Sequence, residues 1–174
     1  MAGFNWERII RDVLRAMWRS LGVDPRRSSK SSPAPRPTTN YPGDFRGLPE
    51  LHYGPRRDQV ADPGEVIWAW VPFEEDFSRG KDRPALVVGY DGGWVLALPM
   101  SSQDHGLDAA QEQRAGRYWV EIGSGKWDSQ GRSSWVRVDR IVRVNPADVR
   151  RHAGDIDRAT FNRVASGLRR HWRD

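Results

Sequence analysis

Four polar residues beside predicted strands could act together on a phosphate group: Arg83, Ser101, Arg137 and Asp139. A guanidinium group is always charged and donates hydrogen bonds in a planar fork that matches phosphate oxygens. The Ser101 hydroxyl could donate one further hydrogen bond. Arg137 and Asp139 stand two residues apart in a predicted strand, so they share a face and could act on one phosphate. Asp139 could orient Arg137, or act as a base if burial raises its pKa.

The same residues also have plain structural explanations. An arginine before a strand is often a solvated edge charge, and Ser101-Ser102 after a strand is ordinary loop sequence. Arg137 and Asp139 could form a surface ion pair of little energetic value. His105, three residues after Ser102, is one of four scattered histidines, and we interpret it as a loop residue.

Other kinds of reactive site have no counterpart in the sequence. There is no metal-ligand spacing, no phosphate-binding glycine loop and no G-x-S-x-G elbow. The absence of cysteine excludes disulfides, thiolate zinc sites and cysteine nucleophiles, and it agrees with a reducing cytoplasm. We therefore expect a cytoplasmic protein with no cofactor and no metal site.

The positive charge of the chain is concentrated in its N-terminal part. The 174 residues contain 28 Lys and Arg against 23 Asp and Glu, which gives a net charge of +5 and a pI near 10.1. Residues 1–40 contain eight of the basic residues and three of the acidic ones, so the rest of the chain is net neutral. A nucleic-acid site there must be a local cluster of arginines rather than a general positive field.

This N-terminal arm divides into a helix and a linker. Apolar residues from Phe4 to Leu21 recur at spacings of three and four, Gly22 is a natural stop, and arginines form a stripe on the opposite side. The pattern predicts an amphipathic basic helix over residues 1–22. This helix could dock on its own domain or on a second copy, contact a membrane surface and so make the protein membrane-associated, or bind a protein partner. Residues 23–61 are rich in Pro, Ser and Arg and then in Gly and Pro, which predicts a disordered linker and an extended lead-in.

Residues 62–174 alternate between short apolar strands and turns, which predicts a mainly β domain. The first predicted strand is apolar on both alternating faces, as a strand packed on two sides would be. Asp91-Gly92-Gly93 is a tight hairpin signal. Five short strands suit a small antiparallel barrel better than a parallel α/β fold. The predicted strands are residues 64–73, 84–90, 94–98, 117–122 and 135–144.

Two helices are predicted after the last strand. Asn145-Pro146 is a cap followed by a first-turn proline, which predicts a short helix to about Ala153. A C-terminal helix is predicted from about Asp157 to Trp172, because apolar residues there form a stripe that can pack on the barrel.

Three blocks of this domain resemble the PemK/MazF family of toxin ribonucleases. The first is Pro63-Gly64-Glu65-Val66-Ile67-Trp68, followed after a charged loop by Gly80-Lys81-Asp82-Arg83-Pro84. The second is Leu98-Pro99-Met100-Ser101-Ser102, which is similar to the family's Pro-x-Thr-Ser segment. The third is Ser134-Trp135-Val136-Arg137-Val138-Asp139-Arg140-Ile141, which is similar to a strand that ends in Val-(Arg/Lys)-x-Asp-Gln. The three blocks stand in the family's order.

The resemblance implies an SH3-like barrel that is usually a homodimer, cleaves single-stranded RNA at short motifs and is held inactive by an antitoxin. It places the family's main catalytic positions at Arg83 and Ser101. Acid/base roles assigned in some members would fall on Arg137 and Asp139.

The chain departs from the family pattern at several positions. Ser101 replaces the usual threonine, Arg140 stands where glutamine is usual, and an insertion rich in tryptophan and glycine spans residues 104–133. Tryptophan side chains can stack on bases. The residues expected to contact RNA are Ser102, Trp119, Trp135 and Arg140.

RNA can be cut by its own 2′-hydroxyl, so the reaction requires neither a metal nor a protein nucleophile. The enzyme must remove one proton, supply another to the leaving 5′-oxygen and stabilise a more negative phosphorane. We therefore expect a metal-independent endoribonuclease. One alternative is a catalytically silent module of the same fold that binds a nucleic acid or a protein partner, which the acidic loop at residues 74–79 and the neutral core favour. Another is a toxin that targets a protein, as in a related barrel family that poisons DNA gyrase.

Overall fold

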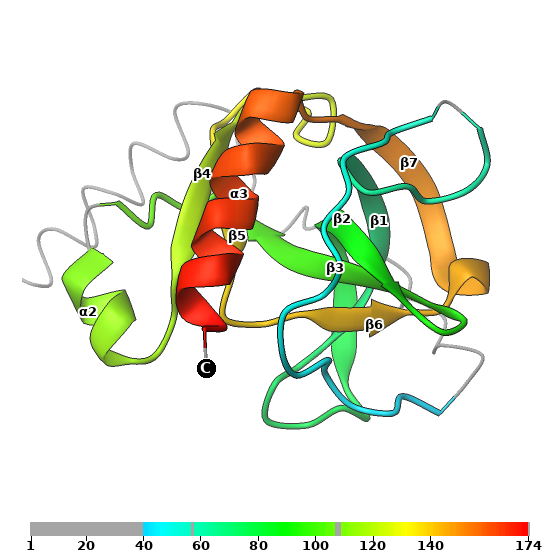
Figure 1. Ribbon diagram of the computed structural model, residues 1–174, viewed down its shortest axis with the longest axis horizontal. Helices are drawn as coiled ribbons and strands as arrows, with labels where there is room; N and C mark the ends of the chain where they lie inside the picture. Colours follow the sequence, from blue (N-terminus) through cyan, green and yellow to red (C-terminus); the bar gives the residue numbers. More distant parts are fainter. Residues whose placement is uncertain (1–39, 57, 107–108, 174) are drawn as a thin grey trace, which may run out of the picture. The chain divides into compact units, whose positions relative to one another are not determined.

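The structure is a computed structural model that describes residues 40–56, 58–106 and 109–173. The helix predicted over residues 1–22 and residues 23–39 of the predicted linker lie outside the described residues. The described part of the chain is mainly β, with antiparallel strands and a C-terminal helix, which confirms the predicted fold class (Figure 1). Its strands are β1 (Glu65–Pro72), β2 (Gly80–Asp91), β3 (Trp94–Ser101), β4 (Trp119–Gly123), β5 (Ser134–Arg137), β6 (Val142–Val144) and β7 (Val149–Asp155). Its helices are α2 (Ala109–Arg114), the 3-10 turn η1 (Pro146–Asp148) and α3 (Arg158–His171).

The sheet is organised around β3. Its strand order is β4-β5-β3-β2-β1-β7, and β6 pairs with β3 beside β5. β2 and β3 form the predicted hairpin, in which Asp91 pairs with Trp94 across two glycines. Gly92 has a φ of +58°, which favours glycine at this turn. β1 is buried on both faces, as its apolar sequence predicted, and so is most of β3.

The strand predicted over residues 135–144 consists of two short strands, β5 and β6. Both are antiparallel to β3: β6 pairs with residues 95–97, whereas β5 pairs with Met100 and Ser101. Pro99 lies between the two pairings and has no N–H group to contribute to a ladder. This interruption accounts for one of the two strands beyond the five predicted.

The helix predicted from Asn145 to about Ala153 is wrong beyond its first turn. Asn145 does act as a cap, because its side chain accepts a hydrogen bond of 2.9 Å from the amide of Ala147. From Val149 onward the chain is instead strand β7, which pairs with the edge of β1 that β2 leaves free. Buried backbone groups must be paired, and here a distant strand decides the conformation that the local signals left open.

Apolar side chains form one cluster on each face of the central sheet. The larger cluster contains Leu86, Leu98 and Val136 and extends to α3, whose Phe161, Val164 and Leu168 are buried against it. The smaller cluster is built mainly from short side chains of β1, β2, β3 and β6: Ile67, Ala69, Val71, Ala85, Val87, Val95, Ala97, Val142 and Val144.

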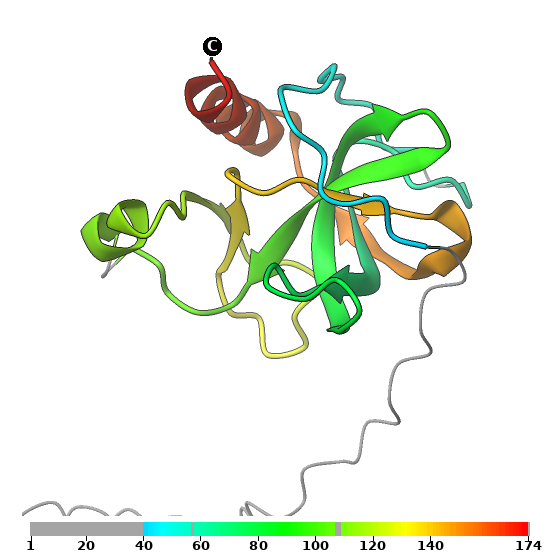
Figure 2. The same ribbon diagram turned by 90° about the horizontal axis from the view of Figure 1, so that it is seen from below.

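The predicted C-terminal helix is present as α3. It lies across β4 and β5, and α2 stands beyond β4, away from the centre of the sheet (Figures 1 and 2). Asp157 caps α3 by accepting a hydrogen bond of 2.6 Å from the amide of Thr160. Gly167 permits the close approach to the sheet, since a Cβ there would lie 2.9 Å from Cγ2 of Val120.

The lead-in before β1 is extended and packs on the domain. Phe45 forms a bridge to Ile141, with its amide 2.8 Å from the carbonyl oxygen. The Tyr53 hydroxyl donates a hydrogen bond of 2.9 Å to the carbonyl of Ile156. Phe45, Leu51 and Tyr53 also pack against the larger apolar cluster, so this segment contributes to the core.

A buried ion pair fastens the lead-in to the sheet. Nε of Arg140 lies 2.8 Å from Oδ2 of Asp44, and the two side chains are only 8% and 11% exposed. Nη2 of Arg140 also donates a hydrogen bond of 2.9 Å to the carbonyl of Pro72 at the end of β1. One guanidinium group therefore joins the lead-in, the segment between β5 and β6, and β1.

Asp44→Asn is expected to lower the free energy of unfolding by about 3 kcal/mol, because it leaves the buried charge of Arg140 without its counter-ion. Glu50→Gln on the same lead-in is the matched control, since the Glu50 side chain is 85% exposed. The control should change stability by less than about 0.5 kcal/mol. Urea denaturation followed by tryptophan fluorescence measures both variants. Equal effects in the two would show that the ion pair does not hold the lead-in.

Candidate active site

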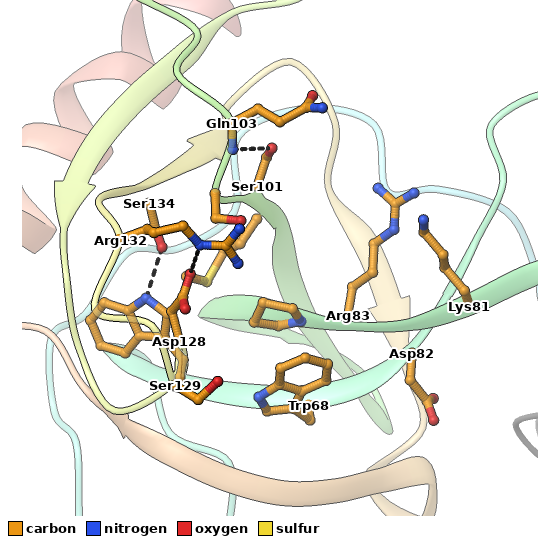
Figure 3. Close-up of a pocket in the computed structure, with 14 residues that line it drawn as sticks. Trp68, Lys81, Asp82, Arg83, Ser101, Gln103, Asp128, Ser129, Arg132 and Ser134 are labelled. Atoms are coloured by element: carbon orange, nitrogen blue, oxygen red, sulfur yellow. Dashed lines mark hydrogen bonds and ion pairs between the residues drawn. The ribbon is translucent and has the colours of Figure 1, made fainter. Parts of the chain in front are cut away.

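A cleft opens where β3 parts from β2. The two strands pair as far as Ala85 and Pro99; beyond these residues β2 continues along β1, whereas β3 pairs with β5. The space between them is a cleft of about 530 Å³ (Figure 3). Its walls are residues 81–84 of β2, residues 100–103 at the end of β3, and parts of the loop between β4 and β5.

Arg83 lies within β2, half-buried in a wall of this cleft. Its side chain makes no hydrogen bond or ion pair with any other described residue, and in Figure 3 it points to the same side of the strand as Lys81. Burial, and to a lesser extent the positive charge of Arg140, lowers the pKa of Arg83. Arginine nevertheless stays charged in proteins. A bound anion would therefore relieve an unfavourable environment.

Ser101 is the last residue of β3 and lines the same cleft as Arg83. Its Oγ accepts a hydrogen bond of 3.1 Å from the amide of Gln103, which leaves the hydroxyl hydrogen available for a ligand. Ser102 follows in the wall. The structure thus brings together the two residues expected to be the main catalytic positions.

The 104–133 insertion supplies the opposite wall. Trp127 anchors it: the side chain is 5% exposed, and its Nε1 donates a hydrogen bond of 3.0 Å to Oγ of Ser134. Arg132 and Asp128 form an ion pair of 2.9 Å on the same loop. The insertion is therefore part of the cleft rather than an appendage to the domain (Figure 3).

Strand register places predicted site residues of three strands on one face of the sheet. In β2, Arg83 is two residues from Ala85, and Ala85 lies opposite Pro99 of β3. Ser101 is two residues from Pro99 and lies opposite Trp135 of β5, which is two residues before Arg137. Opposed residues of antiparallel strands point to the same face, and so do residues two apart along one strand.

Arg137 and Asp139 form a second pair on this face, outside the walls of the cleft. Arg137 donates to both carboxylate oxygens of Asp139, and its Nη1 lies 2.9 Å from Oε2 of Glu74. Asp139 also accepts a hydrogen bond of 2.7 Å from the amide of Tyr118. Burial disfavours the charge of Arg137, but hydrogen bonds to Asp139 and Glu74 outweigh burial and raise its pKa. The Asp139 carboxylate therefore holds the Arg137 guanidinium in place and also accepts a hydrogen bond from Tyr118.

The two tryptophans expected to bind RNA have different surroundings. The ring of Trp119 is stacked on His105, with centroids 3.7 Å apart, and its Nε1 donates a hydrogen bond of 2.9 Å to Glu112. The partly exposed Trp135 instead lines a pocket beside the cleft, together with Ser102. Trp135 therefore faces a space that a base could enter, whereas one face of the Trp119 ring is covered by His105.

Arg140, the fourth residue expected to contact RNA, is buried in its ion pair with Asp44. Its guanidinium has a structural function, and we leave it out of the proposed RNA-binding set. The cleft also contains residues that the sequence did not single out, notably Trp68, Lys81 and Gln103. Lys81 could have been found from the sequence, because it stands two residues from Arg83 in one strand and so shares its face. No local sequence pattern indicated Trp68 or Gln103 as cleft residues.

Residues 40–56, 58–106 and 109–173 contain no group of three or more His, Cys, Asp or Glu side chains that could hold a metal ion. Within the same ranges, no helix has the length and apolar character needed to cross a membrane.

The antiparallel fold has Arg83 and Ser101 in one cleft. Comparison of the sequence with models of protein families identifies the family. Residues 62–172 match the PemK-like, MazF-like toxin of type II toxin-antitoxin systems. The match covers more than half of the chain, so this protein belongs to that family. A comparison with curated proteins gives no match.

Solved structures of the same family are similar to this chain at low sequence identity. MazF from Deinococcus radiodurans is 23% identical, covers 65% of this chain and 96% of its own, and has a TM-score of 0.45. A MazE-MazF structure from the same organism is 22% identical, with coverages of 65% and 96% and a TM-score of 0.45. A mycobacterial endoribonuclease in complex with its cognate antitoxin is 17% identical, with coverages of 63% and 91% and a TM-score of 0.44.

His105 predicts a pH dependence of stability near the site. Burial is the main cause that lowers the pKa of His105, so the folded protein binds a proton there less readily than the unfolded chain does. Stability should therefore fall as the pH drops below about 6.5, the ordinary pKa of histidine. His105→Phe keeps an aromatic ring stacked on Trp119 and removes the titratable imidazole.

Urea denaturation of both proteins between about pH 7.5 and 5 tests this expectation, because the unfolded-state pKa lies inside that range. The wild type should lose stability relative to His105→Phe on acidification, and the difference should be constant above about pH 7. A difference that grows at high pH instead would contradict the sign of the shift.

Proposed function

We propose that this protein is an endoribonuclease that cleaves single-stranded RNA without a metal. The observation that carries the proposal is an unpaired, half-buried Arg83 in the same cleft as the Ser101 hydroxyl, in a chain of the PemK/MazF-like toxin family. A cation without a counter-ion in a concave site of an otherwise neutral domain is a place where a phosphodiester can bind.

The reaction needs the RNA, charge-stabilising side chains, and water to accept one proton and donate another. The 2′-oxygen forms a bond to the adjacent phosphorus and gives its proton to water, while the bond to the 5′-oxygen breaks and that oxygen takes up a proton from water. The products are a 2′,3′-cyclic phosphate and a 5′-hydroxyl. Negative charge on the phosphorane oxygens is greatest at the transition state, where the Arg83 fork and the Ser101 hydroxyl donate hydrogen bonds to it.

Arg137 and Asp139 have supporting roles in this proposal. Asp139 holds the Arg137 guanidinium in place, so Arg137 can contact the RNA backbone from a fixed position. Glu74 occupies one of its nitrogens in the free protein, but that carboxylate is 58% exposed and the contact is weak. A backbone phosphodiester, which also carries one negative charge over two oxygens, can replace Glu74 at this nitrogen.

The proposal includes two macromolecular partners besides RNA. Membership of a toxin-antitoxin family supports an antitoxin protein as the inhibitor. A second copy of the chain is proposed as the partner in a homodimer, because the family pattern described above is usually dimeric.

Arg83→Ala should lower kcat/KM for RNA by roughly 10²–10³, the usual scale for removing one donor to a developing oxyanion. Arg83→Lys should restore little, because a point charge cannot reproduce the planar fork. The matched control is Arg169→Ala, which removes an exposed arginine of α3 and should leave the rate unchanged.

Cleavage is measured on single-stranded RNA in EDTA, and the products are identified by mass. Activity abolished by EDTA, or a 5′-phosphate product, would show that the mechanism is wrong. A folded and inhibitor-free protein that cuts none of a varied set of RNAs would favour the catalytically silent binding module.

Ser101→Ala should slow cleavage by roughly tenfold or more, because it removes a hydrogen bond to a charged transition state. Ser101→Thr should be tolerated, since the hydroxyl remains and the added methyl restricts its rotamers. Single-turnover rates under saturating enzyme separate this effect on chemistry from an effect on binding. If alanine and threonine were equally active, the hydroxyl would have no part in the reaction.

A further inference from the structure

A second pocket, of about 450 Å³, adjoins the cleft. Ser102 and Arg132 line both spaces, so the two are neighbours. The rest of this pocket comes from β4, β5 and the loop after β3, with Glu121, Trp135 and Asp104 in its walls. A strand of RNA held at Arg83 and Ser101 would have this pocket beside it.

A row of three side chains leads from the cleft into the pocket. Ser101 lies opposite Trp135 in the sheet, and Trp135 lies opposite Glu121. Opposed residues share a face, so a hydroxyl, an indole ring and a carboxylate follow one another across three strands. Adjacent strands are about 4.8 Å apart, so the row spans roughly 10 Å. One nucleotide can bridge this length with its phosphate at Ser101 and its base at the far end.

The chemistry of the pocket suits a base rather than a phosphate. The carboxylates of Glu121 and Asp104 repel phosphate, whereas the flat ring of Trp135 can stack on a base. Oε1 of Glu121 accepts a hydrogen bond of 2.5 Å from the Ser133 hydroxyl, which orients the carboxylate and leaves its other oxygen for a ligand. The site therefore accepts hydrogen bonds at its far end.

Guanine is the base that matches such an acceptor. Its Watson–Crick edge presents two adjacent donors, the N1 imino and N2 amino groups, that one carboxylate can accept. Adenine and cytosine present a single amino group beside an acceptor nitrogen, and uracil presents one imino group between two carbonyls. A carboxylate facing those acceptors would be left with an unfavourable contact.

We propose that this pocket selects a guanine base next to the scissile phosphate, with Trp135 stacked on the base and Glu121 bound to its Watson–Crick edge. The inference rests on the proposed function, since it places the reacting phosphate at Arg83 and Ser101. It assigns the choice of cleavage sequence to Glu121 of the insertion and to Trp135, which follows the insertion in β5.

Binding tests the pocket without any need for cleavage. Short 2′-O-methyl oligonucleotides, which cannot react, carry a single guanine or a single inosine, which lacks the 2-amino group. Fluorescence anisotropy should show that the wild type binds the guanine form about tenfold more tightly. Glu121→Gln should bring the two affinities together, and Glu75→Gln, at an exposed glutamate elsewhere, should keep them apart. Equal affinities of the wild type for guanine and inosine would overturn the proposal.

Trp135 is tested with two substitutions. Trp135→Ala should weaken binding of both oligonucleotides by about tenfold, because the stacking surface is lost. Trp135→Phe keeps an aromatic ring in the same strand and should retain most of the affinity. If the phenylalanine variant bound as weakly as the alanine variant although its thermal unfolding was unchanged, the stacking role would be wrong.

Cleavage of a randomised RNA pool, read by sequencing the ends, separates this inference from the proposed function. Guanine should be enriched at one position flanking the cut for the wild type, and Glu121→Gln should remove that enrichment. Guanine-selective binding with no cleavage would contradict the proposed function alone. Cleavage with no guanine preference at either flanking position would contradict this inference alone.

Discussion

The pairing of β3 with different partners on its two edges is the constraint on which the site depends. Backbone groups of a buried strand must all be paired. β3 meets this requirement with β2 along one edge and with β6 and then β5 along the other. Beyond Pro99 the two strands separate, because β2 continues along β1 while β3 stays paired with β5 on its other edge. The cleft forms between the separated strands, with Arg83 in the wall from β2 and Ser101 in the wall from β3.

Ion pairs distinguish Arg137 and Arg140, which stabilise the fold, from Arg83, which is available for a ligand. Arg140 is buried against Asp44, and Arg137 is held by Asp139 and Glu74. Removing a partner from either pair would leave a desolvated charge. Arg83 has no such partner among the described residues. A domain with equal numbers of positive and negative charges can therefore still present a cation without a counter-ion, Arg83, in a concave site.

The insertion that sets this chain apart from the family pattern is integrated with the site. Trp127 anchors its second half in the core, and Trp135 and Glu121 continue the row of side chains that starts at Ser101. The walls shared with the family pattern supply the groups proposed for chemistry. The insertion supplies Glu121, whereas Trp135 belongs to the third block shared with the family, so the groups proposed for choosing a sequence come from both parts of the chain.

The sequence by itself determined the elements that depend on local pattern. The two-sided apolar run of β1, the stripe and cap of α3, and the three blocks that predicted Arg83 and Ser101 as site residues were all readable from neighbouring residues. The tertiary structure alone decided β7, the division of the last long strand, the burial of Arg140 and the row that joins Ser101 to Glu121. The reason is physical: periodicity and capping act within a few residues, whereas strand pairing and burial depend on partners tens of residues away.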